Sequence, residues 1–180
     1  MSLLELLFTD APTPARLWAE LDPGTRRQAA AALYRGTRGH AAGRREADAA
    51  ISAVLRFREV AVRRLTIERR VGYLSGAVRP DDGLATSLLL ALHLERRTAL
   101  LRTFLDQLGI PHQDGVIDDE ADVDQIDFRR LDEAVDGLYA VHPREQVELY
   151  LASLITMEPE MWRGLAEALR RRQTSRSVEG

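Results

Sequence analysis

The sequence predicts an all-α fold, with about eight helices packed as irregular antiparallel helical hairpins around one core and no β-sheet. Apolar residues recur at helical spacing along nearly all of the 180 residues. Alternation with a period of two, which is typical of strands, never lasts more than a few residues. Proline and glycine stand where the helical pattern stops and starts again, as expected for caps and turns between helices.

The N-terminal third predicts two short helices followed by a loop. Thr13-Pro14 and Asp22-Pro23 each place a capping side chain before a proline in the first helical turn. This arrangement predicts helices over residues 14–21 and 23–35. Three glycines between residues 36 and 43 then interrupt the pattern, so this stretch is expected to be a loop.

The middle of the chain predicts four helices. Residues 45–70 are expected to form two of them, because Thr66 suits the cap of a separate second helix. Residues 84–96 and 98–108 form the next two, and Gly109 ends the second in the usual manner of a helix C-terminus. The apolar stripe expected to face the core in the first of these segments contains Ile51, Val54, Leu55, Val62 and Leu65.

The C-terminal part predicts three more helices and a tail. Asp127 can cap a helix over residues 128–142. A proline then begins each of the next two helices, over 143–156 and 159–172, where its missing N–H costs nothing. Residues 173–180 are expected to be disordered.

Length and composition favour one domain. A hydrophobic share of 45% and a charged share of 29% are those of a globular protein, and 180 residues suffice for one core. We expect a single domain over residues 1–172, with residues 1–35 as a semi-independent N-terminal arm.

Several protein classes are excluded or disfavoured by composition. The chain has no cysteine, which removes disulfides, thiolate metal sites and cysteine nucleophiles. The N-terminus lacks the features of a secretory signal, and no apolar stretch approaches the ~20 residues that span a bilayer. We therefore expect a cytoplasmic protein with no membrane contact.

Charge is distributed unevenly along the chain. Residues 1–80 contain fourteen arginines against eight acids, whereas residues 81–160 contain six arginines against eighteen acids. The sequence contains no lysine, so arginine alone supplies the positive charge. A basic part and an acidic part in one chain can attract each other, a second copy or a charged partner protein.

The segment from Asp114 to Asp127 is the leading functional candidate. It holds seven carboxylates and no arginine, and it lies in a connection longer than compact domains usually need. Its spacing does not match the calcium-binding EF-hand loop, since valine stands where glycine is required. Helix capping accounts for the acids nearest the following helix. The acids without such an explanation are Asp118, Asp119, Glu120 and Asp122.

A second candidate site is rich in arginine. If these side chains lined one face of a helix, they could contact successive phosphates of a nucleic acid. The acidic overall charge and the scarcity of aromatic residues disfavour this interpretation. The arginines concerned are Arg56, Arg58, Arg63, Arg64, Arg69 and Arg70.

Catalytic and metal signatures are weak. No nucleophile elbow, phosphate-binding loop or histidine metal motif occurs in the sequence. His93 and His112 could form a metal-assisted active site with the acidic segment if the fold brought them together. Otherwise no cofactor is expected. The sequence thus favours a non-catalytic protein-interaction domain using the acidic segment 114–127, with nucleic-acid binding and metal-assisted catalysis as alternatives.

Overall fold

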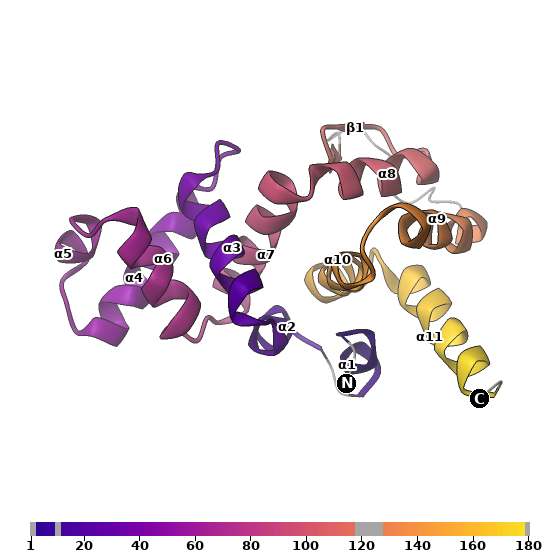
Figure 1. Ribbon diagram of the computed structural model, residues 1–180, viewed down its shortest axis with the longest axis horizontal. Helices are drawn as coiled ribbons and strands as arrows, with labels where there is room; N and C mark the ends of the chain where they lie inside the picture. The colour runs from indigo at the N-terminus through magenta and orange to yellow at the C-terminus, as the bar shows by residue number, and fades with distance from the viewer. Residues whose placement is uncertain (1–2, 10–11, 118–127, 179–180) are drawn as a thin grey trace. The chain divides into compact units, whose positions relative to one another are not determined.

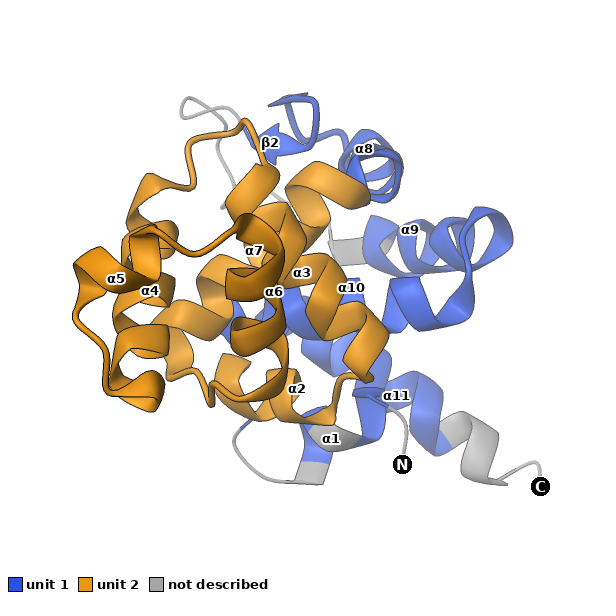
Figure 2. Ribbon diagram, turned by 60° about the vertical axis from the view of Figure 1, so that its left-hand side comes forward, with its two compact units in different colours: residues 1–12, 97–180 blue, residues 13–96 orange. Residues whose placement is uncertain are grey.

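The structure, a computed structural model, describes residues 3–9, 12–117 and 128–178 (Figure 1). Within these residues it contains eleven helices and one two-stranded hairpin, so the predicted all-α class is confirmed. The chain divides into two compact units (Figure 2). Unit 1 combines Met1–Pro12 with Arg97–Gly180, and unit 2 is Thr13–Arg96.

Unit 2 is built from six helices. Each of α2, α3 and α6 begins at a predicted cap: Thr13, Asp22 and Thr66 accept hydrogen bonds from the backbone N–H of the third residue after them. The helices are α2 (Pro14–Glu20), α3 (Pro23–Arg35), α4 (Ala41–Leu55), α5 (Glu59–Arg63), α6 (Ile67–Gly76) and α7 (Asp82–Arg96).

The core of unit 2 lies where α3 packs against α6 and α7, with α2 packing on α7. Leucine and alanine make up most of it, and the hydrophobic effect favours removing these side chains from water. Fully buried members include Leu33 on α3, Leu74 on α6 and Leu88 on α7. Residues 14–35, part of the predicted arm, therefore lie inside this unit, while the number of independently folding domains stays a prediction.

In its described residues, unit 1 contains five helices and the hairpin. Helix α8 packs on α9, α11 on α9 and α10 on α1. An aromatic cluster lies in its core: the Phe104 ring meets Tyr150 edge-on at 5.6 Å and Trp162 at 5.8 Å between ring centroids. The elements are α1 (Leu3–Thr9), α8 (Thr98–Leu108), β1 (His112–Gln113), β2 (Val116–Ile117), α9 (Phe128–Val141), α10 (Arg144–Met157) and α11 (Arg163–Val178).

The hairpin corrects the prediction that no β-sheet exists. Strands β1 and β2 pair antiparallel, with His112 opposite Ile117. Asp114 and Gly115 occupy the turn with positive φ angles of 51° and 85°, as a tight two-residue turn requires. The Asp-Gly pair is the sequence signal for this turn, but the segment around it was expected to be an irregular connection between helices.

Other differences concern helix boundaries. Helices α1 and α5 add to the expected number, and α5 divides a segment predicted to hold only two helices. Helix α4 begins at Ala41, so Gly43 lies within a helix and the loop before it is short. Helix α11 continues to Val178, into the segment for which we expected disorder.

Candidate functional site

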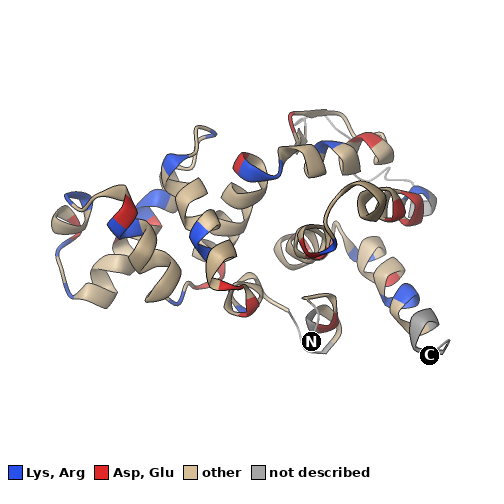
Figure 3. Cartoon of the chain, in the orientation of Figure 1, with Lys and Arg blue, Asp and Glu red and all other residues tan. Residues whose placement is uncertain are grey.

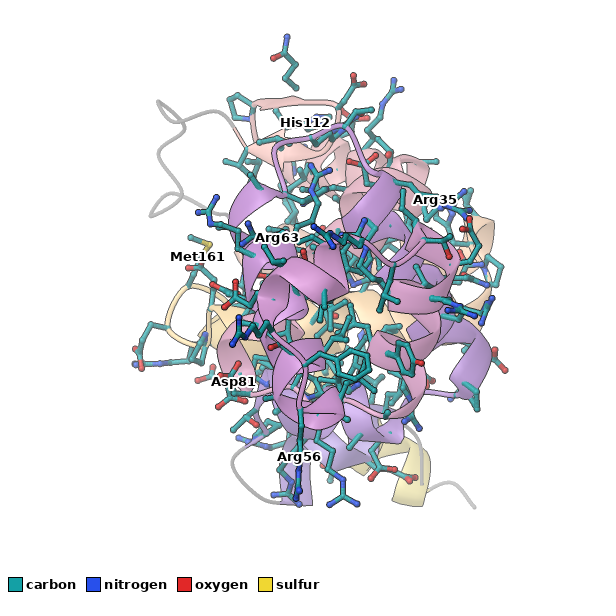
Figure 4. All side chains as sticks on the ribbon, turned by 90° about the vertical axis from the view of Figure 1, so that its left-hand side faces the viewer. Arg35, Arg56, Arg63, Asp81, His112 and Met161 are labelled. Carbon is teal, nitrogen blue, oxygen red and sulfur yellow. The ribbon has the colours of Figure 1, made fainter. Side chains whose placement is uncertain are left out.

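The six arginines of the second candidate site are divided among three elements of unit 2. Arg56 and Arg58 lie in the connection between α4 and α5, Arg63 and Arg64 at the end of α5, and Arg69 and Arg70 on α6. Figure 4 shows Arg56 near the lower end of the unit in that view and Arg63 well above it. The predicted arginine face of one helix is therefore absent, because the chain turns twice between Leu55 and Ile67.

These arginines also differ in their partners. The side chain of Arg70 is half-buried against Asp48, and Arg63 pairs with Glu59 at 3.1 Å. Arg56, Arg58 and Arg64 are exposed. Among the residues that the structure describes, no carboxylate lies within ion-pairing distance of these three. Their charge is available to another molecule.

Three large apolar side chains are exposed beside them. Val54, Phe57 and Val60 expose 47%, 52% and 60% of their surface to solvent. Phe57 is three residues from each valine, so the three lie on the short stretch of chain that ends α4, crosses the connection and begins α5. We call Val54, Arg56, Phe57, Arg58 and Val60 the Phe57 surface. The expectation that Val54 faces the core is wrong, because Val54 in the last turn of α4 is about half exposed although Ile51, one turn earlier, is buried.

The backbone of Phe57 is held firmly in this exposed position. Its N–H donates to the carbonyl of Ser52 at 3.1 Å, and its carbonyl accepts from Ser52 Oγ at 2.5 Å. Arg56 ends α4 in the left-handed conformation, with φ at 54°. The exposure of the phenyl ring therefore follows from the fold of this turn.

A buried polar cluster lies beneath the corner between α4 and α6. Asp48 on α4 accepts a hydrogen bond from the Tyr34 hydroxyl at 2.8 Å and from Arg70 Nη1 at 3.3 Å. The Arg70 guanidinium also lies over the Tyr34 ring, 4.7 Å from its centroid. The cluster links α3, α4 and α6, because each of the three residues comes from a different helix.

The electrostatics of this cluster favour a structural role. Burial raises the pKa of the Tyr34 hydroxyl far above its usual value, and the hydrogen bond to Asp48 raises it further. The hydroxyl thus stays protonated and acts as a donor. Asp48 is almost fully buried, and its charge is balanced by Arg70. This arrangement holds three helices together and offers no activated nucleophile.

The histidines have separate partners. His40 Nε2 lies 2.9 Å from Glu95 in unit 2, while in unit 1 His112 Nε2 lies 3.0 Å from Asp106. His93 is buried in α7. Among the described residues, no group of three or more histidine, aspartate or glutamate side chains could hold a metal ion. The metal-assisted alternative also needs the acids of 118–127, so it stays a prediction.

The acidic segment is described only at its start. Asp114 stands in the turn of the hairpin, where its carboxylate lies 3.9 Å from Arg102. Gly115 packs closely on Leu101 of α8, which attaches the turn to the body of unit 1. The four acids predicted to form the site, Asp118, Asp119, Glu120 and Asp122, lie outside the described residues.

The division into units coincides with the division of charge. Unit 2 contains fifteen arginines against nine acids, and unit 1 contains ten arginines against nineteen acids. The arginines of unit 2 are spread over its helices, whereas acidic positions of unit 1 gather on α9 (Figure 3). Two of these acids, Asp132 and Asp136, both bind Arg172 of α11, at 2.9 Å and 2.7 Å.

Comparison with known proteins adds no functional information. No family model, curated protein or solved structure matches the chain. Within the described part of the chain, no helix has the length and apolar character needed to cross a bilayer. The function must therefore be inferred from the surfaces themselves.

Sequence reasoning missed the Phe57 surface because it assigned the apolar residues of 45–70 to buried faces. A signal was nevertheless present. Phe57 stands between two arginines and outside the stripe that contains Ile51 and Val62. An aromatic residue outside the apolar stripe of its segment is expected to be exposed, and exposed apolar residues that cluster can mark an interaction site.

Proposed function

We propose that this protein is a non-catalytic, cytoplasmic interaction domain and that the Phe57 surface is its main docking site. The observation that carries the proposal is the exposure of Phe57 between Arg56 and Arg58, on a backbone held by Ser52. Aromatic and arginine residues dominate the energetics of protein interfaces. The surface combines both types in one turn.

The energetic argument is one of burial. Covering a large apolar side chain contributes about 1.5–3 kcal/mol relative to leaving it exposed. In this turn Val54, Phe57 and Val60 are all exposed to water in the isolated chain. A partner that covers them gains their transfer free energy. The rigid backbone also reduces the entropy lost on binding.

The acidic segment belongs to the same proposal as a second contact. Asp118, Asp119, Glu120 and Asp122 add to the negative charge of unit 1. A run of carboxylates favours a basic protein partner or the basic unit of a second copy.

Nucleic-acid binding is the weaker alternative. Arg63 and Arg70 are already paired with acids of unit 2. The remaining arginines are divided between two connections and α6, so they do not share one helix along which a phosphate backbone could lie. Phe57 alone would offer a base one stacking partner.

Photocrosslinking in the source cells tests the proposal. Benzoylphenylalanine at position 57 keeps an aromatic ring there and is expected to give a discrete protein adduct. The matched control is the same residue at position 141, because Val141 is 69% exposed in unit 1. The adduct should form again when the purified partner and this protein are mixed. If position 57 gives no adduct beyond that of position 141, the proposal is wrong.

A further inference from the structure

We infer that the Phe57 surface binds an acidic segment of a partner protein in which apolar side chains stand among the carboxylates. This inference rests on the proposed function and states the chemistry of the partner. Two properties of the surface carry it: arginines without a carboxylate partner among the described residues, and apolar side chains that these residues leave about half exposed.

The charge requirement comes from Arg56 and Arg58. These two residues flank Phe57 directly, and in the described part of the chain neither has a carboxylate within ion-pairing distance. Glu59, the nearest acid in sequence, is 3.1 Å from Arg63. A guanidinium group presents a planar set of donors that matches a carboxylate in two places at once. The partner should therefore supply a carboxylate for each of the two arginines.

The apolar requirement comes from Val54, Phe57 and Val60. A purely charged ligand would leave all three exposed, and their burial would contribute nothing. A protein segment with leucine, phenylalanine or similar residues between its acids meets both requirements. Contact with the apolar side chains also excludes water from the ion pairs, which strengthens them.

Two other anionic ligands fit less well. A single-stranded nucleic acid could stack a base on Phe57, but its phosphates would give both valines no apolar partner. An anionic membrane surface is normally bound by a longer amphipathic helix with a broad apolar face. Helix α5 has only five residues.

The backbone at Arg56 supports use of its side chain. Arg56 ends α4 with φ at 54°, a conformation that costs an L-residue free energy and that glycine adopts readily. An arginine in this position puts a guanidinium next to Phe57 at some cost in stability. Strain of this kind is typical of residues kept for a contact.

The test begins with the adduct formed at position 57. Its partner segment is identified by mass spectrometry, synthesised as a peptide and titrated against the full chain by fluorescence anisotropy. We expect a segment with net negative charge and at least one large apolar residue. We also expect the affinity to fall as salt rises.

Variants then separate the two requirements. Phe57→Ala and the pair Arg56→Gly with Arg58→Gln should each weaken peptide binding by about tenfold or more. Arg79→Gln and Val141→Ala are the matched controls, because both residues are exposed and neither belongs to the Phe57 surface. Both controls should bind as the unchanged protein does.

Several results would overturn the inference. The inference is wrong if the crosslinked segment is neutral or basic. It is also wrong if an acidic peptide binds the variant with Arg56→Gly and Arg58→Gln as tightly as it binds the unchanged protein. A third contrary result is that the protein binds mixed-sequence single-stranded DNA or phosphatidylserine vesicles more tightly than the peptide and that Phe57→Ala abolishes this binding. The surface would then be assigned to that ligand. If the segment is Asp114–Asp127 of a second copy, the inference stands and the partner is the chain itself. If no adduct forms, the proposed function fails as well.

Discussion

The hydroxyl of Tyr34 donates a hydrogen bond to Oδ1 of Asp48 across 2.8 Å, inside unit 2. The two residues come from α3 and α4, which have few direct contacts compared with those between α3 and α6. The bond therefore joins helices that apolar packing alone holds together weakly. Arg70 adds α6 to the same cluster at 3.3 Å from Asp48.

Replacing Tyr34 by phenylalanine should lower the free energy of unfolding by about 1–2 kcal/mol. The ring remains under Arg70, but Asp48 loses the hydroxyl donor. Urea unfolding measures the change. Tyr73→Phe is the control, since the Tyr73 hydroxyl makes no hydrogen bond to a described residue. Equal effects of the two substitutions would show that the hydrogen bond to Asp48 does not stabilise the fold.

Removing Asp48 itself should cost more. Asp48→Ala leaves the half-buried guanidinium of Arg70 without its counter-charge, and breaking a buried ion pair from one side costs about 3–5 kcal/mol. Because the Arg70 side chain is still 18% exposed, we expect the lower end of that range. Thermal unfolding followed by circular dichroism measures the loss. The double variant Asp48→Ala with Arg70→Met should recover part of the lost stability. If this double variant is less stable than Asp48→Ala alone, the unpaired charge of Arg70 does not cause the loss.

Glu95 should make stability depend on pH. Its carboxylate accepts hydrogen bonds from the Arg38 N–H at 3.0 Å and from His40 at 2.9 Å. Burial raises the pKa of Glu95, but these hydrogen bonds outweigh burial and hold the pKa below its usual value. The folded state therefore binds a proton less readily than the unfolded state. The stabilisation is complete above the usual glutamate pKa of about 4.3 and is lost as pH falls through the lower folded value.

The variant Glu95→Gln should remove this dependence. At neutral pH we expect it to be less stable by about 1.5–3 kcal/mol, the range for hydrogen bonds to a charged group. The difference from the unchanged protein should shrink between pH 6 and pH 3, as measured by urea unfolding at each pH. Glu46→Gln is the control because Glu46 is exposed. A difference that stays constant across this range would contradict the account of Glu95.

The capped helices show what local sequence determines. Thr13, Asp22 and Thr66 begin the helices that their sequence positions predict, because the side-chain oxygen and the N–H it accepts from are three residues apart. Gly109 likewise ends α8 with φ at 70°, as its place in the sequence indicates. Such features depend only on near neighbours, so they could be predicted reliably.

The Phe57 surface shows what local sequence does not determine. The spacing of Val54 and Ile51 places both on one side of α4, yet Ile51 is fully buried and Val54 is half exposed. This difference in exposure depends on which part of α4 the other helices cover, and packing between distant segments decides that. The hydrogen bond from Tyr34 to Asp48 could not be predicted for the same reason, because the register between α3 and α4 brings the two residues together.

Two glycines inside helices should respond to alanine with opposite signs. A Cβ at Gly43 of α4 would meet Ser87 Cβ at 2.8 Å and Leu33 Cδ1 at 3.0 Å, whereas a Cβ at Gly72 of α6 would meet nothing within 4 Å. Gly72→Ala should therefore stabilise the protein by about 0.5–1 kcal/mol through helix propensity. Gly43→Ala should destabilise it by about 1–3 kcal/mol, the usual cost of overpacking. Thermal unfolding distinguishes the two, and a stabilised Gly43→Ala would mean that α4 and α7 can move apart without cost.

Arg56→Gly should separate stability from binding at the Phe57 surface. Because Arg56 has φ at 54°, glycine relieves a left-handed conformation that costs an L-residue about 1–2 kcal/mol. Glycine also loses more backbone entropy on folding, so we expect a net stabilisation of about 0.5–1 kcal/mol. Arg58→Gly is the control: Arg58 has an extended φ of −73°, so the same loss of a guanidinium there relieves no strain and should destabilise slightly. Urea unfolding gives the stabilities, and titration with the crosslinked peptide gives the affinities.

We expect both variants to bind more weakly while their stabilities change in opposite directions, so a loss of binding in Arg56→Gly cannot be attributed to unfolding. If Arg56→Gly binds as tightly as the unchanged protein, the arginine is not held in its strained conformation for the sake of the partner.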